Sequence, residues 1–128
     1  SPDGRYVAFD SRAGEESQVV VRAFPSGPGR WQVTTDGGEA PRWTRNGREI
    51  VYRSSGKLLA VSVAQQGGEP SFGEPQELFQ DTMLLSGPRR PGYAVAPDGQ
   101  SVLLAEPTGR PSPPTIRVVL NWLAEYSR

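Results

Sequence analysis

The sequence predicts an all-β chain of short antiparallel strands joined by tight turns. Gly (15) and Pro (13) make up more than a fifth of the 128 residues, and both are unfavourable inside helices. Between the Gly/Pro clusters lie short runs rich in Val, Thr and aromatic residues, which favour strands. One pattern, a turn followed by a strand, also occurs three times along the chain.

The repeated unit is a four-residue turn that leads directly into a strand. Its copies read SPDGRYVAFDS from Ser1, TRNGREIVYRS from Thr44 and APDGQSVLLAE from Ala96. Pro at the second position sets φ to about −65°, Asp or Asn at the third bonds to its own backbone, and Gly at the fourth supplies a positive φ. We therefore expect a type I turn closed by a left-handed Gly, a common short hairpin connection. The residues with this structural role are Asp3, Gly4, Asn46, Gly47, Asp98 and Gly99.

The strands follow in order from the same reasoning. In the first repeat they are Arg5–Ser11, Gln18–Phe24 and Arg30–Thr34, and Glu39–Trp43 follows the Gly37-Gly38 break. In the second repeat they are Arg48–Arg53, Lys57–Val63 and Gln76–Phe79, followed by Gly92–Val95. In the third repeat they are Gln100–Ala105 and Thr115–Leu120. The additional residues of the second repeat are expected in two loops, Gln65–Pro75 and Asp81–Pro91, because loops accept insertions at low cost.

The spacing of the turns predicts the architecture. Gly4, Gly47 and Gly99 recur at intervals near or somewhat above the ~40–45 residues of a four-stranded propeller blade. The expected fold is a partial β-propeller of about 2.5 four-stranded antiparallel blades in an open arc. Residues 1–38 would form an incomplete blade (strands b, c and d), residues 39–90 a complete blade, and residues 91–128 an incomplete last blade (strands a, b and c) plus a tail. We expect this arc to be the C-terminal piece of a larger propeller, with Trp122, Leu123 and Tyr126 on one face of a short C-terminal helix.

Composition narrows the possible functions. The chain has no Cys and no His, which excludes disulfides, thiolate or imidazole catalysis, and the usual zinc sites within it. Lys+Arg and Asp+Glu are both 14, so the basic excess typical of nucleic-acid binders is missing. No run approaches the ~18 apolar residues of a membrane span. We therefore expect a chain without catalytic residues, metal, cofactor, membrane segment or nucleic-acid partner.

Turns, a Gly-Gly break and a Pro-x-Trp element occur in a fixed order along the chain. They are Ser1–Gly4, then Gly37-Gly38 with Pro41–Trp43, then Ala96–Gly99. This order resembles the WD40-like (PD40) repeat of TolB-type propellers. The tail Val118–Glu125 is similar to the C-terminus of propeller regions that follow bacterial serine/threonine kinase domains or winged-helix regulators.

The resemblance implies a non-catalytic module that serves as the sensor or scaffold region of a bacterial signalling protein with a kinase-type parent. Its partners would be the remaining blades of the parent propeller and a protein, peptide or small ligand. The resemblance favours a periplasmic or extracytoplasmic location, and a cytoplasmic one stays possible.

Candidate binding residues lie in loops that we expect at one face of the propeller. In a four-stranded blade the a–b and c–d turns share one face, and the b–c and d–a loops share the other face, where propellers often bind partners. Those loops are Ser11–Ser17, Thr35–Glu39, Arg53–Gly56, Asp81–Pro91 and Glu106–Pro114. The candidate binding residues within them are Arg12, Glu15, Asp36, Arg53, Asp81, Arg89 and Arg90.

A hydrolase propeller is the alternative function, either a glycosidase or the gating propeller of a prolyl-oligopeptidase-like serine peptidase. A glycosidase requires two carboxyl groups. The carboxylates in or beside the loops are Glu15, Glu16, Asp36, Glu39, Asp81 and Glu106. In the peptidase case the missing His leaves this chain non-catalytic. Trp31 and Trp43 are candidates to stack on a ligand, but we expect Trp43 to fill the space between blades and Trp31 to be half exposed.

Overall fold

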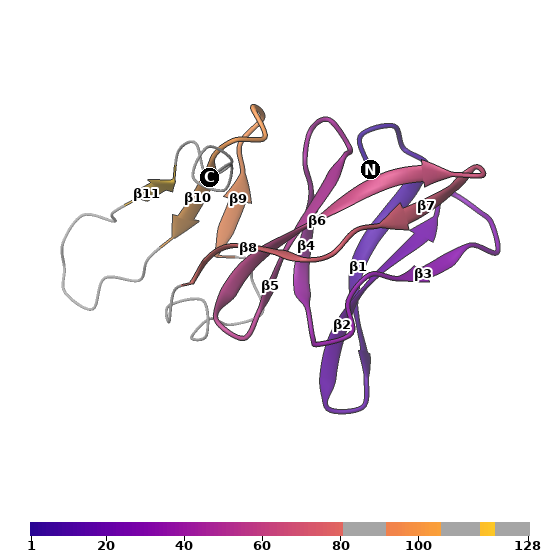
Figure 1. Ribbon diagram of the computed structural model, residues 1–128, viewed down its shortest axis with the longest axis horizontal. Coiled ribbons are helices and arrows are strands. Elements are labelled where there is room, and N and C mark those ends of the chain that lie inside the picture. Colours follow the sequence, from indigo (N-terminus) through magenta and orange to yellow (C-terminus); the bar gives the residue numbers. More distant parts are fainter. Residues whose placement is uncertain (81–91, 106–115, 120–128) are drawn as a thin grey trace.

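The computed structural model describes residues 1–80, 92–105 and 116–119. Within these ranges the chain is all-β, as predicted, and contains no helix. The strands form several antiparallel sheets, none of which closes on itself in the described ranges (Figure 1). The helix expected around Trp122, Leu123 and Tyr126 lies outside the described residues.

Three sheets follow one another along the chain. The first sheet has the order β1 (Tyr6–Ala13), β2 (Glu16–Ala23) and β3 (Arg30–Gln32). The second sheet has the order β4 (Glu39–Trp43), β5 (Glu49–Ser54) and β6 (Lys57–Gln66), and β6 also pairs with both β7 (Glu69–Phe72) and β8 (Gln76–Gln80). The third sheet has the order β9 (Tyr93–Val95), β10 (Val102–Ala105) and β11 (Ile116–Val119).

The prediction of a loop over Gln65–Pro75 is wrong. Strand β6 continues to Gln66, and β7 returns alongside it after a two-residue turn. That turn is Gly67-Gly68 with φ of 61° and 88°, the signature of a type I′ hairpin turn. A Gly pair is compatible with an insertion loop, but it is also a strong hairpin signal.

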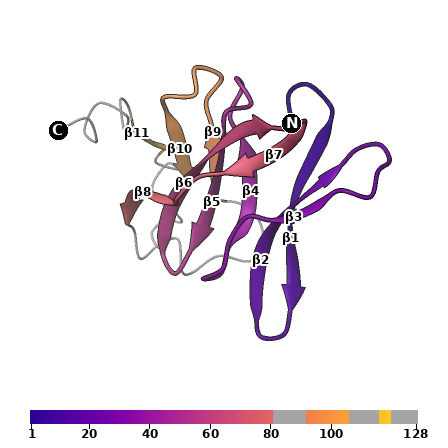
Figure 2. The ribbon, with the colours of Figure 1, turned by 45° about the vertical axis from the view of Figure 1, so that its right-hand side comes forward.

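The loop expected at Ser11–Ser17 is also mostly strand. Strand β1 runs to Ala13 and β2 starts at Glu16, so that only Gly14-Glu15 forms the turn. Gly14 has φ of 83°, which permits this tight connection. The resulting hairpin extends beyond the neighbouring strands (Figure 2). Arg53, expected in a loop, lies within β5.

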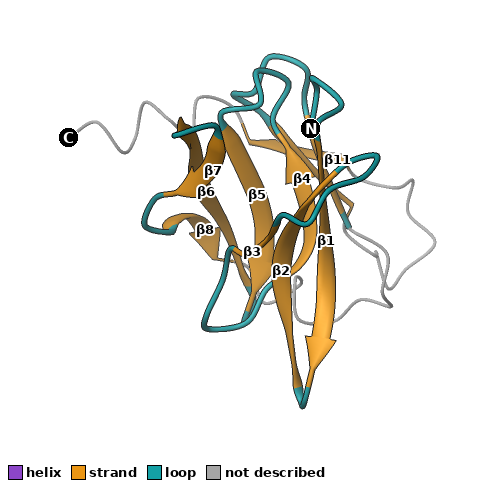
Figure 3. Ribbon diagram, turned by 90° about the vertical axis from the view of Figure 1, so that its right-hand side faces the viewer, coloured by secondary structure: helices purple, strands orange, loops and turns teal. Residues whose placement is uncertain are grey.

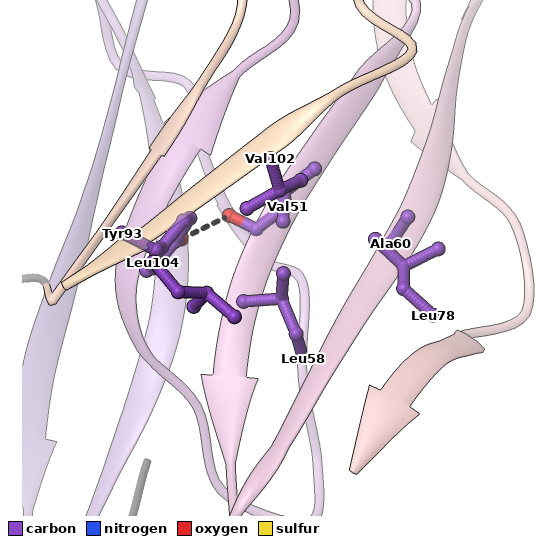
Figure 4. Close-up of a cluster of buried hydrophobic side chains, with 7 residues drawn as sticks. All are labelled: Val51, Leu58, Ala60, Leu78, Tyr93, Val102 and Leu104. Atoms are coloured by element: carbon purple, nitrogen blue, oxygen red, sulfur yellow. Dashed lines mark hydrogen bonds between the residues drawn. The ribbon is translucent and has the colours of Figure 1, made fainter. Parts of the chain in front are cut away.

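Two hydrophobic clusters join the sheets in chain order. Tyr6, Val19 and Val21 of the first sheet contact one face of the second sheet. On the opposite face of the second sheet, Val51 and Leu58 are among the residues that meet the third sheet, as Figure 4 shows. The second sheet is therefore covered on both faces.

The repeated turns gather at one end of the sheets. The segment before β1, the β4–β5 turn and the β9–β10 turn all lie at the upper end in Figures 1 and 2. The β1–β2 and β5–β6 turns lie at the opposite end. We call these the turn end and the loop end.

Gly47 adopts φ of 69°, a conformation that costs a residue with a side chain ~1–2 kcal/mol. Gly47→Val is expected to lower the free energy of unfolding by at least this amount, because a β-branched side chain is the least suited to positive φ. Gly47→Asn is the matched control, since Asn tolerates this region. Urea denaturation measures the free energy of unfolding of both variants. Lost ligand binding in Gly47→Val at unchanged stability would contradict a purely structural role for this turn.

The β5–β6 turn offers a stabilising substitution. Ser55 and Gly56 connect the paired residues Ser54 and Lys57, and both have positive φ (49° and 74°). Asn-Gly is the preferred pair for such a turn, so Ser55→Asn is expected to raise the free energy of unfolding by about 0.5 kcal/mol. Ser55→Val should lower it. Thermal unfolding of the two variants checks the order.

Candidate functional site

The turn end is built by side chains that bond to their own turns. Asn46 Oδ1 accepts hydrogen bonds from Thr44 Oγ1 at 2.7 Å and from the Arg48 N–H at 3.0 Å. In the third copy, Asp98 Oδ1 accepts the N–H groups of Gln100 and Ser101 at 2.9 and 3.1 Å. These oxygens are occupied by local hydrogen bonds, which is the structural role expected for turn residues.

Asp3 is held in the same way. It accepts hydrogen bonds from the Ser1 hydroxyl and the Arg5 N–H, and its Oδ2 lies 2.8 Å from Arg5 Nε. The Ser1 and Arg5 hydrogen bonds keep the pKa of Asp3 well below its usual range. Asp98 also has a lowered pKa, chiefly through the Gln100 N–H. Both side chains therefore stay ionised at neutral pH and are weak bases.

A hollow of about 610 Å³ lies at the turn end between the first and second sheets. Its lining includes Asp3, Arg5, Tyr6 and Trp43. Trp43 is half-buried against the first hydrophobic cluster, and its Nε1 has no hydrogen-bond partner in the described part of the chain. Asp3 and Arg5 already pair with each other here, so the hollow offers few free charged groups.

Trp31 is half-buried and does not line this hollow. Its ring meets Tyr6 edge to face, with centroids 5.8 Å apart and an interplanar angle of 77°. This geometry is typical of packed aromatic pairs.

At the loop end, the segment between β3 and β4 is tied to both neighbouring sheets. The Gly38 N–H donates to the Ser17 carbonyl at 2.7 Å. The Ser54 hydroxyl donates to the Asp36 carbonyl at 3.1 Å. Figure 3 shows the β1–β2 hairpin as the element that extends furthest at this end.

A bulge in β4 brings Glu39 opposite Arg53. The β4–β5 register shifts between Glu39 and Arg42, and Ala40 has φ of 52° at this point. Arg53 Nη2 consequently lies 3.5 Å from Glu39 Oε1. The Arg53 side chain is only 6% exposed, whereas that of Glu39 is 49% exposed.

Arg53 is an incompletely satisfied buried charge. Its Nε has no hydrogen-bond partner within the described ranges. The contact with Glu39 is longer than the ~2.7–2.9 Å of a good charge-assisted hydrogen bond. Buried guanidinium groups normally have their donors paired, because desolvation without compensation is costly.

Arg53 lines a hollow of about 260 Å³ together with Arg12, Glu16, Asp36 and Glu39. A second hollow of about 290 Å³ includes Arg12 and Glu39 as well. We call the first of these the Arg53 pocket. Two cationic and three anionic side chains therefore share one small, polar site.

The structure brings three of the predicted binding residues together, namely Arg12, Asp36 and Arg53. Glu15 is exposed in the β1–β2 turn and does not line the Arg53 pocket. Asp81, Arg89 and Arg90 lie outside the described residues.

Two features of the site do not follow from the sequence pattern. The sequence indicates Glu39 only as half of a carboxylate pair, because its pairing with Arg53 depends on the bulge at Ala40. Glu16 was assigned to a loop but belongs to β2. The Gly37-Gly38 pair was the available signal, since it marks the segment that closes the pocket.

No protein-family model matches the chain, and no curated protein matches it either. Within the described ranges, no cluster of acidic residues is arranged to hold a metal ion. The described ranges also contain no helix that could cross a bilayer.

Proposed function

We propose that this chain is a non-catalytic binding module in which the three sheets are successive blades of a β-propeller and the loop end receives the ligand. The observation that carries this proposal is the exposure of apolar side chains on the outer faces of the first and third sheets. Equivalent positions of the second sheet are fully covered.

Aligning the three turn glycines pairs Val7 of β1 with Ile50 of β5. Ile50 is 0% exposed and belongs to the cluster between the first and second sheets. Val7 is 40% exposed. In a strand, residues of equal parity share a face, so Val7 points away from the second sheet as Ile50 points toward the first. Phe24, 57% exposed, follows β2 with the parity of this outer face.

The third sheet also has an exposed apolar residue on its outer face. The same alignment pairs Leu103 of β10 with Val51 of β5. Val51 is 0% exposed within the cluster that joins the second and third sheets, whereas Leu103 is 36% exposed. Both outer faces therefore carry apolar residues at positions that a neighbouring sheet covers in the middle of the chain. We infer that a further sheet of the same repeat covers each of these faces.

The Arg53 pocket supports binding at the loop end. Its lining comes from β1, β2, β4 and β5 and from the turns beside them, and its buried cation lacks a full set of partners. The resemblance to propeller regions of kinase-type signalling proteins suggests how such binding is used. The module would act as the sensor or scaffold region of its parent protein.

Chemical-shift mapping of the ¹⁵N-labelled chain tests this function. The probes are acetate, methylammonium, phenol and glycine, which cover anionic, cationic, aromatic and zwitterionic chemistry. We expect the shifted amides to cluster at the loop end, around Asp36 and Ser54. Shifts confined to the turn end, around Asn46 and Gly47, would overturn the proposal.

A hydrolase role is the second candidate, because Glu16, Asp36 and Glu39 line one pocket. Two carboxyl groups at a suitable separation are the core of glycosidase chemistry. Nitrophenyl glycosides test this role directly. Release of nitrophenol that Asp36→Asn and Glu39→Gln both abolish would favour the hydrolase over the binding module.

A further inference from the structure

The charge arrangement of the Arg53 pocket indicates what kind of molecule it takes. Arg53 is 5% exposed, and its Nε is unpartnered in the described part of the chain. Nε and Nη2 donate along the same edge of the guanidinium, the edge that receives a carboxylate in a bidentate pair. Glu39 makes only one contact with this edge, at 3.5 Å from Nη2. Nε is therefore a donor without an acceptor, on an edge where Glu39 contacts only Nη2.

The rest of the pocket disfavours anions that carry more than one negative charge. Glu16, Asp36 and Glu39 lie around the same hollow and would repel a dianion such as phosphate. These carboxylates would instead attract an ammonium group. A molecule that carries both charges satisfies Arg53 without being repelled by the acidic side chains.

The size of the pocket points to a small molecule. Its volume of about 260 Å³ lies just below the ~300–1,000 Å³ typical of sites for drug-sized ligands. The lining is polar, because it also includes Ser17, Ser54 and Ser55. An extended apolar ligand would find little surface to cover.

We propose that the Arg53 pocket binds a small zwitterionic amino compound of the free α-amino acid class. The ligand carboxylate occupies the Nε–Nη2 edge of Arg53, and its ammonium group lies among Glu16, Asp36 and Glu39. Arg12, which also lines the pocket, is the second cationic side chain available to the ligand. This inference names the ligand class for the proposed loop-end binding and rests on that function.

The test follows the side-chain Nε–H signal of Arg53 in ¹H–¹⁵N spectra of the 128-residue chain. Glycine, acetate, methylammonium and inorganic phosphate are titrated separately. We expect glycine to shift the Arg53 Nε–H signal and to bind more tightly than acetate. Phosphate binding at Arg53 as tight as glycine, equal affinities for glycine and acetate, or an Arg53 signal that no probe shifts would each overturn the proposal.

Substitutions test which side chains contact the ligand. Arg53→Gln is expected to weaken glycine binding about tenfold or more, because it removes a charge-assisted pair of hydrogen bonds. Glu39→Gln should lower the ratio of glycine to acetate affinity, since it removes both a competitor for Arg53 and an ammonium partner. Arg22→Gln is the matched control: Arg22 is exposed on β2 and does not line the pocket. An unchanged amide spectrum away from the site verifies that each variant is folded.

The outcome separates this inference from the proposed function. If phenol or methylammonium shifts loop-end amides while the Arg53 Nε–H signal stays silent, the ligand class is wrong and the binding module stands. If no probe shifts the loop end at all, both proposals fail.

Discussion

Replacement of Tyr93 by Phe is expected to lower the free energy of unfolding by about 1–3 kcal/mol. The Tyr93 hydroxyl lies within hydrogen-bond distance of the carbonyl oxygens of Ala40 and Val51, so it links β9 of the third sheet to β4 and β5 of the second. Figure 4 shows the contact with Val51. Tyr93 is 5% exposed, and burial raises the pKa of its hydroxyl well above the usual range. Removing the hydroxyl takes away the single proton that the two carbonyls share, while the ring stays in place.

Urea denaturation of Tyr93→Phe and Tyr6→Phe measures this effect. Tyr6 is 9% exposed in the cluster between the first and second sheets, and its hydroxyl bridges no pair of sheets in the described ranges. Its loss should change stability by less than about 0.5 kcal/mol. Equal losses in the two variants would show that the bond between the second and third sheets contributes little.

Arg53→Met is expected to raise the free energy of unfolding by about 1 kcal/mol or more. Replacement of a poorly compensated buried charge by an apolar side chain of similar length is often stabilising by ~1–4 kcal/mol. Glu39, the partner left behind, is half exposed and can be solvated. The same variant should lose glycine binding, a trade-off of the kind that marks functional positions.

Thermal unfolding of Arg53→Met is compared with that of Arg22→Met. The control replaces an exposed arginine of the neighbouring sheet and should shift stability by less than about 0.5 kcal/mol. A clear loss of stability in Arg53→Met would mean that Arg53 serves the fold rather than a ligand.

Much of the fold could be predicted from the sequence because its turns are specified by a few neighbouring residues. The turns at Gly4, Gly47 and Gly99 have φ of 73°, 69° and 67°, as the left-handed Gly in the pattern requires. The strands that follow them begin within two or three residues of the turn glycine. Strand β7 was missed because a hairpin that extends one strand of a sheet has the same Gly-rich sequence as an insertion loop.

The candidate site was less accessible to prediction. Loop-end residues Arg12, Asp36 and Arg53 were chosen from the expected topology, and they do line one pocket. The burial of Arg53 and its loose contact with Glu39 could not be foreseen, because they depend on the Ala40 bulge. Ala40 takes a positive φ without being Gly, Asn or Asp, so the sequence carries no signal for this bend.

The exposed apolar residues Val7, Phe24 and Leu103 on the outer faces of the first and third sheets are the basis of the blade assignment. The association state of the chain tests this assignment most directly. Light scattering coupled to size-exclusion chromatography should show concentration-dependent self-association of the 128-residue chain, because these faces cover one another when no further sheet does. The double variant Val7→Asp/Leu103→Asp should associate much less, with an unchanged strand signal in circular dichroism. A stable monomer of the unsubstituted chain at all concentrations would contradict the account.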